Sequence, residues 1–151
     1  MSAIAIPFDP WCVDYYRTMA ATLAVCRAIR NGAWTISIAK NFWIVNRDFK
    51  ALLTDLDRVT DAPVGDLRMT IPRLEELHKS INKTLDITAK SGLTNRTLIN
   101  APVHSLRAYN TRLLDVIERW KLSLDPSVSA ATRQAIEEYE RGETVSLDSL
   151  V

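Results

Sequence analysis

The sequence is poor in cysteine, glycine and proline, and its charges are nearly balanced. Among 151 residues there are two cysteines, four glycines and six prolines, with 19 basic and 18 acidic side chains. So few glycines and prolines exclude a low-complexity chain and a β-sandwich with many tight turns. The balanced charge argues against a globally basic nucleic-acid-binding protein. No apolar run approaches the roughly 18 residues that a membrane span requires.

The two cysteines predict free thiols. If Cys12 and Cys26 share a helix, they lie about 21 Å apart, because each residue advances a helix by about 1.5 Å. A disulfide needs Cα atoms within about 7 Å, so we expect a reducing, cytoplasmic environment. The first residues lack the basic region and long apolar run of a signal peptide. With no Cys-x-x-Cys pair, Cys/His cluster or nucleotide-binding glycine motif, we expect neither a metal nor another cofactor.

What the sequence does contain is apolar periodicity, since 47% of its residues are hydrophobic. Four segments, at about 10–30, 33–59, 70–91 and 100–124, repeat apolar residues every three or four positions, as amphipathic helices do. The third is expected to begin at Thr70 and the fourth at Asn100, because proline is tolerated in a helix's first turn. The short connections predict an all-α, up-and-down antiparallel four-helix bundle in residues 1–124.

Each predicted helix has one face that we expect to be buried. The second follows the four–three alternation for three heptads and gives the strongest signal. Asn110 interrupts the fourth face; it either fixes the helix register or sits at the edge of the stripe. The predicted buried residues are, by helix, Cys12, Tyr16, Met19, Leu23 and Cys26; Ile38, Phe42, Val45, Phe49, Leu52, Leu56 and Val59; Leu74, Leu77, Ile81 and Leu85; and Val103, Leu106, Asn110, Leu113, Ile117 and Trp120.

The last part of the chain, residues 125–151, is acidic. It holds six acidic and two basic side chains, whereas residues 66–124 hold ten basic and six acidic ones. We predict a fifth helix reaching Arg141, followed by a short extended tail. This region either belongs to the same domain or is an appendage that docks on the bundle or on a partner. A simple solvated acidic helix is the alternative.

Within residues 135–151 the sequence carries Glu138, Tyr139, Arg141, Gly142, Glu143, Val145 and Leu147. This stretch resembles the toxin-binding tails of bacterial antitoxins of the Phd/YefM type. The resemblance implies a bacterial protein with a protein partner. It further implies that Tyr139, Glu143, Val145 and Leu147 contact that partner. An acidic helix followed by a short alternating strand suits folding on a partner.

A second, shorter pattern is Arg73-Leu-Glu-Glu-Leu-His78. It resembles the Arg-x4–6-His motif of the HEPN family of helical-bundle ribonucleases. The resemblance implies metal-independent RNA cleavage, in which His78 transfers protons and Arg73 holds a phosphate. Five helical residues turn the two side chains about 140° apart. The alternative is therefore that His78 is a surface residue beside the buried stripe.

Trp34 and Trp43 lie off the buried stripe of the second predicted helix. We interpret them as additional core; the alternative is an exposed patch that binds a partner and supports dimerisation through the first two helices. Residues 11–45 also hold four basic side chains and one acidic side chain among aromatic residues, which would suit an anionic lipid surface.

The leading hypothesis from the sequence is a non-enzymatic, cytoplasmic, bacterial protein-interaction module. We expect a protein partner or self-association into an oligomer, and neither nucleic acid nor a small-molecule substrate. The candidate partner-binding residues are Trp34 and Trp43 in the bundle, together with the tail residues. A ribonuclease using Arg73 and His78 and a membrane-associating bundle remain the alternatives.

Overall fold

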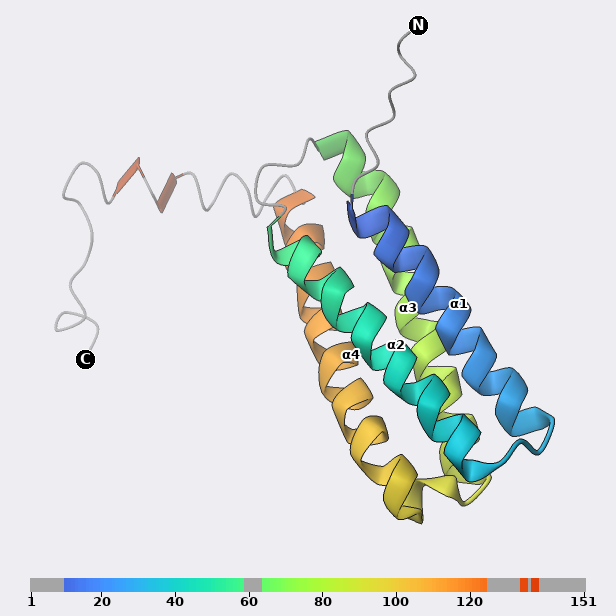
Figure 1. The fold of residues 1–151 in the computed structure, drawn as a ribbon. Helices are drawn as coiled ribbons and strands as arrows, with labels where there is room; N and C mark the ends of the chain where they lie inside the picture. Colours follow the sequence, from blue (N-terminus) through green and yellow to red (C-terminus); the bar gives the residue numbers. More distant parts are fainter. Residues whose placement is uncertain (1–9, 59–63, 125–133, 136, 139–151) are drawn as a thin grey trace, which may run out of the picture.

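The structure is a computed structural model that describes residues 10–58, 64–124, 134–135 and 137–138. The bundle consists of four α-helices and contains no strand within this described part of the chain. The helices are α1 (Pro10–Arg30), α2 (Thr35–Asp57), α3 (Val64–Lys90) and α4 (Thr97–Leu124), with a short 3-10 helix, η2 (Leu93–Asn95), between the last two (Figure 1). The predicted all-α helical bundle is confirmed.

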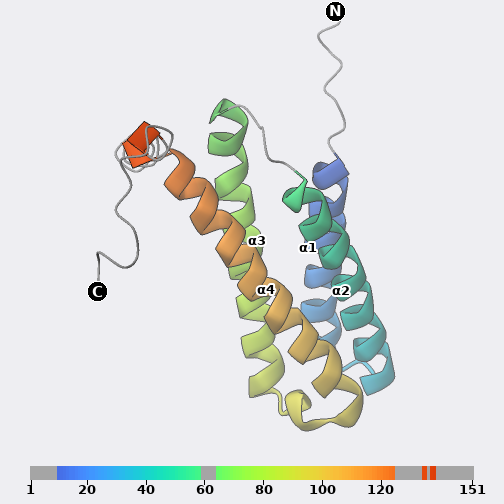
Figure 2. The same cartoon turned by 90° about the vertical axis from the view of Figure 1, so that its left-hand side faces the viewer.

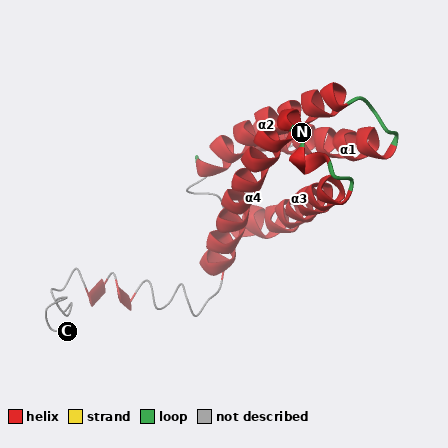
Figure 3. Ribbon diagram, turned by 90° about the horizontal axis from the view of Figure 1, so that it is seen from below, coloured by secondary structure: helices red, strands yellow, loops and turns green. Residues whose placement is uncertain are grey.

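Successive helices run in opposite directions, but neighbours in the bundle are not always neighbours in the sequence. α1 packs against α2 and α3, and α4 packs against the same two helices. α2 and α3 therefore occupy diagonal corners, as the end-on view makes visible (Figure 3). In consequence, the adjacent pairs α1/α3 and α2/α4 run parallel, while the α1–α2 and α3–α4 hairpins lie side by side (Figure 2).

A glycine follows the end of α1 and another follows the end of α3. Gly32, with φ of 67°, and Gly92, with φ of 75°, adopt the left-handed conformation that glycine enters without a steric cost. After α1 the N–H of Ala33 donates to the carbonyl of Ala28 at 2.9 Å. The N–H of Gly32 donates to the carbonyl of Ile29 at 3.1 Å. This pair of hydrogen bonds closes the helix end and satisfies carbonyls that would otherwise lack donors.

Two helices begin earlier than predicted. α3 begins before Thr70 and α4 before Asn100, so that Pro72 and Pro102 both lie inside helices. A proline removes one backbone hydrogen bond, which weakens a helix without ending it when packing holds both sides. Ile71, directly before Pro72, is buried in the core and anchors the preceding turn.

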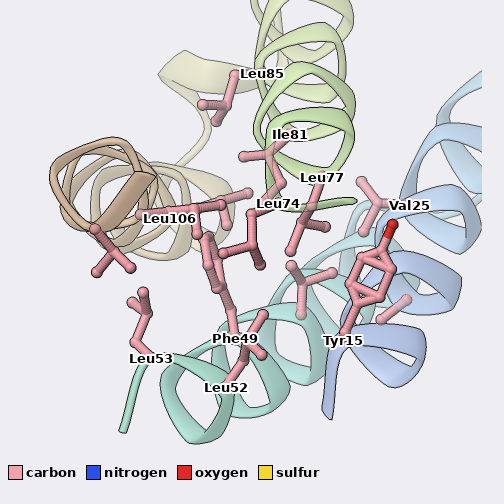
Figure 4. Packing of buried hydrophobic residues seen from close by; sticks show 14 of the residues in the cluster. Tyr15, Val25, Phe49, Leu52, Leu53, Leu74, Leu77, Ile81, Leu85 and Leu106 are labelled. Atoms are coloured by element: carbon pink, nitrogen blue, oxygen red, sulfur yellow. The ribbon is translucent and has the colours of Figure 1, made fainter. Parts of the chain in front are cut away.

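The predicted buried faces of α2, α3 and α4 are confirmed, with Val59 outside the described residues. Figure 4 shows these side chains converging from the helices into one core. Asn110 lies among them and is only 3% exposed, so it is part of the buried face and not at its edge. Burial of these apolar side chains is the main force that holds the helices together.

The predicted buried face of α1 is confirmed at Cys26 but wrong at Tyr16 and Leu23. Tyr16 and Leu23 are 60% and 51% exposed, and the helix is rotated so that other residues face the core. The rotation buries threonines, whose hydroxyls donate to the carbonyl four residues earlier in the same helix and so remain hydrogen-bonded. A search for apolar residues misses such positions. The buried residues of α1 are Tyr15, Thr18, Ala21, Thr22, Val25 and Cys26.

Two adjacent aromatic residues of α2 allow a matched test of this packing. Phe42 is fully buried, whereas Trp43 is 62% exposed. We expect Phe42→Ala to lower the free energy of unfolding by about 3–5 kcal/mol, because it removes a large buried side chain. Trp43→Ala should cost less than about 1 kcal/mol. Chemical denaturation followed by circular dichroism measures both, and equal losses would contradict the orientation of α2.

Candidate functional site

The basic side chains of the α1–α2 hairpin all point to solvent. Each of the seven lysines and arginines in residues 10–58 is exposed. Long basic side chains keep their charged ends in water, because removing a charge from water is costly. These residues are Arg17, Arg27, Arg30, Lys40, Arg47, Lys50 and Arg58.

Two of the hairpin's four acidic residues instead face each other between the helices. Asp14 of α1 and Asp55 of α2 are both half-buried. Burial raises the pKa of Asp14 to about 6, and a hydrogen bond with Asp55 together with the negative charge of Asp55 adds to the increase. Nearby Asp48 acts in the same direction, whereas Arg17 opposes it. Like charges at close range favour a shared proton over two ionised carboxyls.

The other two acidic residues of the hairpin are paired with arginines. Asp48 is 8% exposed, and its Oδ1 lies 3.3 Å from Nη2 of Arg47. Asp57 accepts a hydrogen bond from Nη2 of Arg112 on α4 at 3.1 Å and lies 3.8 Å from Arg119. All four carboxyls are thus turned inward or paired. The outer surface of the hairpin is consequently positive, although residues 1–65 hold seven basic and six acidic side chains.

One stripe of this surface combines positive charge with large apolar side chains. Ile36, Lys40, Trp43, Arg47 and Lys50 alternate four and three residues apart on α2, which places them on one side of the helix. Ile36 is 59% and Trp43 62% exposed. The guanidinium carbon of Arg47 lies 5.4 Å from the centre of the Trp43 ring, a cation–π arrangement. We call these five residues the α2 face.

The interpretation of Trp34 and Trp43 as additional core is therefore wrong. Trp34, just before α2, is 81% exposed. Trp11 is partly buried against the core and Trp120 is buried, so the two tryptophans of the second segment differ from the other two. Tyr16 on α1 adds a further exposed aromatic ring. Exposed tryptophans are uncommon on surfaces that contact only water, and they mark candidate contact sites.

His78, Asn82 and Asn110 form a closed set of hydrogen bonds between α3 and α4. Nδ1 of His78 lies 2.9 Å from the amide oxygen of Asn110, so this nitrogen carries the ring proton and donates. The amide nitrogen of Asn82 donates to Nε2 of His78 at 3.2 Å, and that of Asn110 donates to the Asn82 oxygen at 2.8 Å. Buried polar groups paired in this way fix how two helices align.

The structure brings His78 to Asn110 and not to Arg73. Arg73 is exposed on the other side of α3. Burial raises the pKa of Tyr15 on α1, and Arg73 lies close enough to lower it in part. Both ring nitrogens of His78 are already occupied by the two asparagines. A histidine that transfers protons needs a nitrogen within reach of the substrate, so this geometry fits a structural role better.

Two open surface pockets flank α4. One, of about 350 Å³, lies over the network of His78, Asn82 and Asn110. The other, of about 480 Å³, lies between α2 and α4, and its charged side chains include the paired Asp57 and Arg112. His78, Asn82 and Asn110 bond to one another in the first pocket, and Asp57 pairs with Arg112 and Arg119 in the second; these contacts stabilise the bundle.

Neither a metal site nor a membrane span emerges from the described residues. No three histidine, cysteine, aspartate or glutamate side chains among them are arranged to hold a metal ion. None of the helices described has the length and apolar character needed to cross a bilayer. The contact of Asp14 with Asp55 thus contributes to the electrostatics of the fold.

The tail residues named from the sequence, Tyr139, Glu143, Val145 and Leu147, lie outside the described residues, as does most of the predicted fifth helix. Residues 134–135 and 137–138 are helical. Within them the Gln134 side chain donates to Glu138 at 3.2 Å.

No protein-family model, curated protein or solved structure matches this chain. The resemblances to antitoxin tails and to HEPN ribonucleases stay predictions. The function is therefore inferred from the chemistry of the protein's own surface.

The hydrogen-bonded network gives one prediction about stability. Asn110→Ala should lower the free energy of unfolding by about 2 kcal/mol, because it leaves the ring N–H of His78 without its acceptor. Asn100→Ala, which changes an exposed amide bonded to the Thr94 carbonyl, is the control and should cost about 0.5 kcal/mol or less. Nitrogen-15 NMR of the His78 ring in the native protein should show the proton on Nδ1. A proton on Nε2 would contradict the network.

The acidic contact gives a pH-dependent prediction. The pKa of Asp14 rises from 3.8 to about 6 on folding, so the folded state binds more protons between these values and Asp14 lowers stability as the pH rises through them. Asp14→Asn removes this penalty. At pH 7.5 we expect a gain of about 1 kcal/mol, which allows for solvent screening of a half-exposed group.

The gain from Asp14→Asn should disappear near pH 4, where the wild-type carboxyl is protonated in the folded state. Thermal unfolding at several pH values measures the difference between the two proteins. Asp115→Asn, at an exposed position on α4, is the control and should show no such trend. A gain that stays constant from pH 4 to 7.5 would contradict the burial of Asp14 against Asp55.

Proposed function

We propose that the protein is a non-enzymatic interaction module that binds an acidic segment of a protein partner through the α2 face. The observation that carries this proposal is the exposed stripe of Ile36, Lys40, Trp43, Arg47 and Lys50. Tryptophan and arginine are the residues that most often dominate the binding energy of protein interfaces. Lys40 and Lys50, on either side of Trp43, would attract and orient a negatively charged partner.

The charge arrangement supports an acidic partner in particular. Lys40 and Lys50 make no ion pair among the described residues, and Arg47 shares its charge with the buried Asp48. Carboxylates from a partner would therefore meet unpaired lysines, while apolar side chains would cover Trp43 and Ile36. This combination is that of an interface with a compact apolar centre and a charged rim.

The alternatives fit the same residues less well. Insertion into an anionic membrane favours a broad, continuous apolar face, whereas the α2 face has a basic residue between and beyond its two apolar ones. RNA cleavage would require Arg73 and His78 to act on one phosphate, but these residues are directed toward α1 and α4, respectively. The binding experiment described below also tests the membrane and ribonuclease alternatives.

The C-terminal resemblance to antitoxin tails points to the same class of function, a bacterial protein that acts by binding another protein. Cys26 forms no disulfide, and its Sγ lies 2.9 Å from Oγ1 of Thr84; we propose the cytoplasm as the compartment because it keeps such thiols reduced. In this proposal the bundle supplies a rigid surface, and the residues after it supply a second, acidic contact element.

The proposal is tested with charge-matched variants. Lys40→Glu/Lys50→Glu reverses two charges on the α2 face, and Lys79→Glu/Lys83→Glu reverses two exposed lysines on α3. Proteins that bind the wild type in extracts of its native cells are identified by mass spectrometry, purified and titrated by calorimetry. We expect the first variant and Trp43→Ala to weaken binding at least tenfold. The α3 variant should change it less than twofold.

Binding should also weaken as salt rises, because the contact is electrostatic in part. Equal losses from the α2 and α3 variants would contradict a specific α2 face. Binding to anionic phosphatidylserine vesicles or to single-stranded RNA, with no protein that depends on Lys40 and Lys50, would replace the proposal by the membrane or nucleic-acid alternative.

A further inference from the structure

We infer that the α2 face binds the acidic C-terminal segment of a second copy of this chain, so that the protein associates with itself. The inference rests on the proposed function of the α2 face and names one occupant for it. Four observations support it: the division of charge along the chain, the position of the segment's origin, the side chains available, and the lengths of the two elements.

The first observation is the charge. Residues 1–124 hold 17 basic and 12 acidic side chains, whereas residues 125–151 hold two basic and six acidic ones. Inside the bundle the acidic residues of α1 and α2 are buried or paired, which leaves the bases outside. The chain therefore contains a positive surface and a negative segment. Opposite charges on separate parts of one molecule favour association of copies.

The second observation is position. α4 passes the end of α2, where Arg112 and Arg119 both approach Asp57, and continues to Leu124. The helical residues 134–135 and 137–138 lie beyond the end of α4 and outside the bundle (Figures 1 and 3). An acidic segment that starts outside its own bundle can meet the α2 face of another copy. Two copies can satisfy each other reciprocally in a closed dimer.

The third observation is that the side chains match. The segment contains the acidic residues Glu137, Glu138, Glu140 and Glu143, which suit Lys40 and Lys50. It also contains Tyr139, Val145 and Leu147, which suit the exposed surfaces of Trp43 and Ile36. Aromatic and apolar contacts inside a ring of ion pairs are the usual composition of a specific interface.

The fourth observation is length. From Ile36 to Lys50 the α2 face is about 21 Å long at the helical rise of about 1.5 Å per residue. Residues 137–148 would span about 17 Å as a helix and up to about 36 Å when extended. The segment therefore covers most of the α2 face as a helix and all of it when extended.

Self-association would regulate the proposed function. When the α2 face is covered by the segment of a second copy, it is closed to an external acidic partner. The partner must then compete with the dimer, and its apparent affinity falls as the protein concentration rises.

The test uses full-length chains with reversed charges. Lys40→Glu/Lys50→Glu makes the α2 face acidic, and Glu138→Lys/Glu143→Lys makes the segment more basic. In analytical ultracentrifugation from 5 to 300 μM we expect a reversible dimer for the wild type. Each variant alone should show a dissociation constant at least tenfold higher. The equimolar mixture of the two variants should form a heterodimer, since each altered surface then meets a complementary one.

The mixture distinguishes contact between copies from contact within one chain. A wild type that stays monomeric up to 300 μM, or a mixture that fails to associate, would overturn the inference. The Lys79→Glu/Lys83→Glu control should dimerise like the wild type, and an equal loss there would also overturn it. If the wild type stays monomeric while an external partner still binds it and loses affinity for Lys40→Glu/Lys50→Glu, the proposed function stands without this inference.

Discussion

The surface of this protein depends on how α2 distributes its charged residues around its axis. One side of the helix is filled by the core, with apolar residues from Ile38 to Leu56 buried. The flanks touch α1 and α4, and the acidic residues of the helix occur there: Asp55 faces Asp14, and Asp57 faces Arg112. Only the outer side is left for the basic residues. The packing of the core thus also determines the sign of charge that the helix presents to solvent.

Placing the carboxyls of Asp14 and Asp55 close together costs free energy, and the packing of the apolar core compensates for this cost. Holding Asp14 against Asp55 in a half-buried position disfavours the ionised form of Asp14. A bundle with a smaller apolar core would relieve the repulsion by separating α1 from α2. Here Ala21 and Val25 of α1 are buried against the core, and small and branched side chains of this kind allow close helix packing. The close approach of α1 and α2 keeps the carboxyls inward and the cations outward.

The sequence predicts most of the fold because three helices follow a strict period. On α2, α3 and α4 the periodic apolar positions that the structure describes are all buried, so the pattern and the burial coincide, although some polar residues such as Thr84 and Thr88 are buried as well. On α1 they do not, because Thr18 and Thr22 are buried with their hydroxyls bonded to their own helix, while Tyr16 is exposed. The diagonal placement of α2 and α3 is likewise absent from the pattern, since periodicity identifies a buried face without naming the helix that covers it.

The candidate site is less accessible to sequence reasoning than the fold, and α2 shows why. Residues 10–58 hold seven basic and four acidic side chains, yet the surface is more positive than this count, because counting ignores which side chains are buried. Trp43 follows Phe42 in the sequence, but the turn of about 100° per residue carries it out of the core, so that Phe42 is buried and Trp43 is exposed.

Asn110 and His78 carry separate signals along the chain, a polar residue in an apolar stripe and a histidine at its edge. Only the packing of α3 on α4 joins them in one network. The α2 face and the polar network thus both depend on which helices pack against each other. That information lies in the contacts between helices.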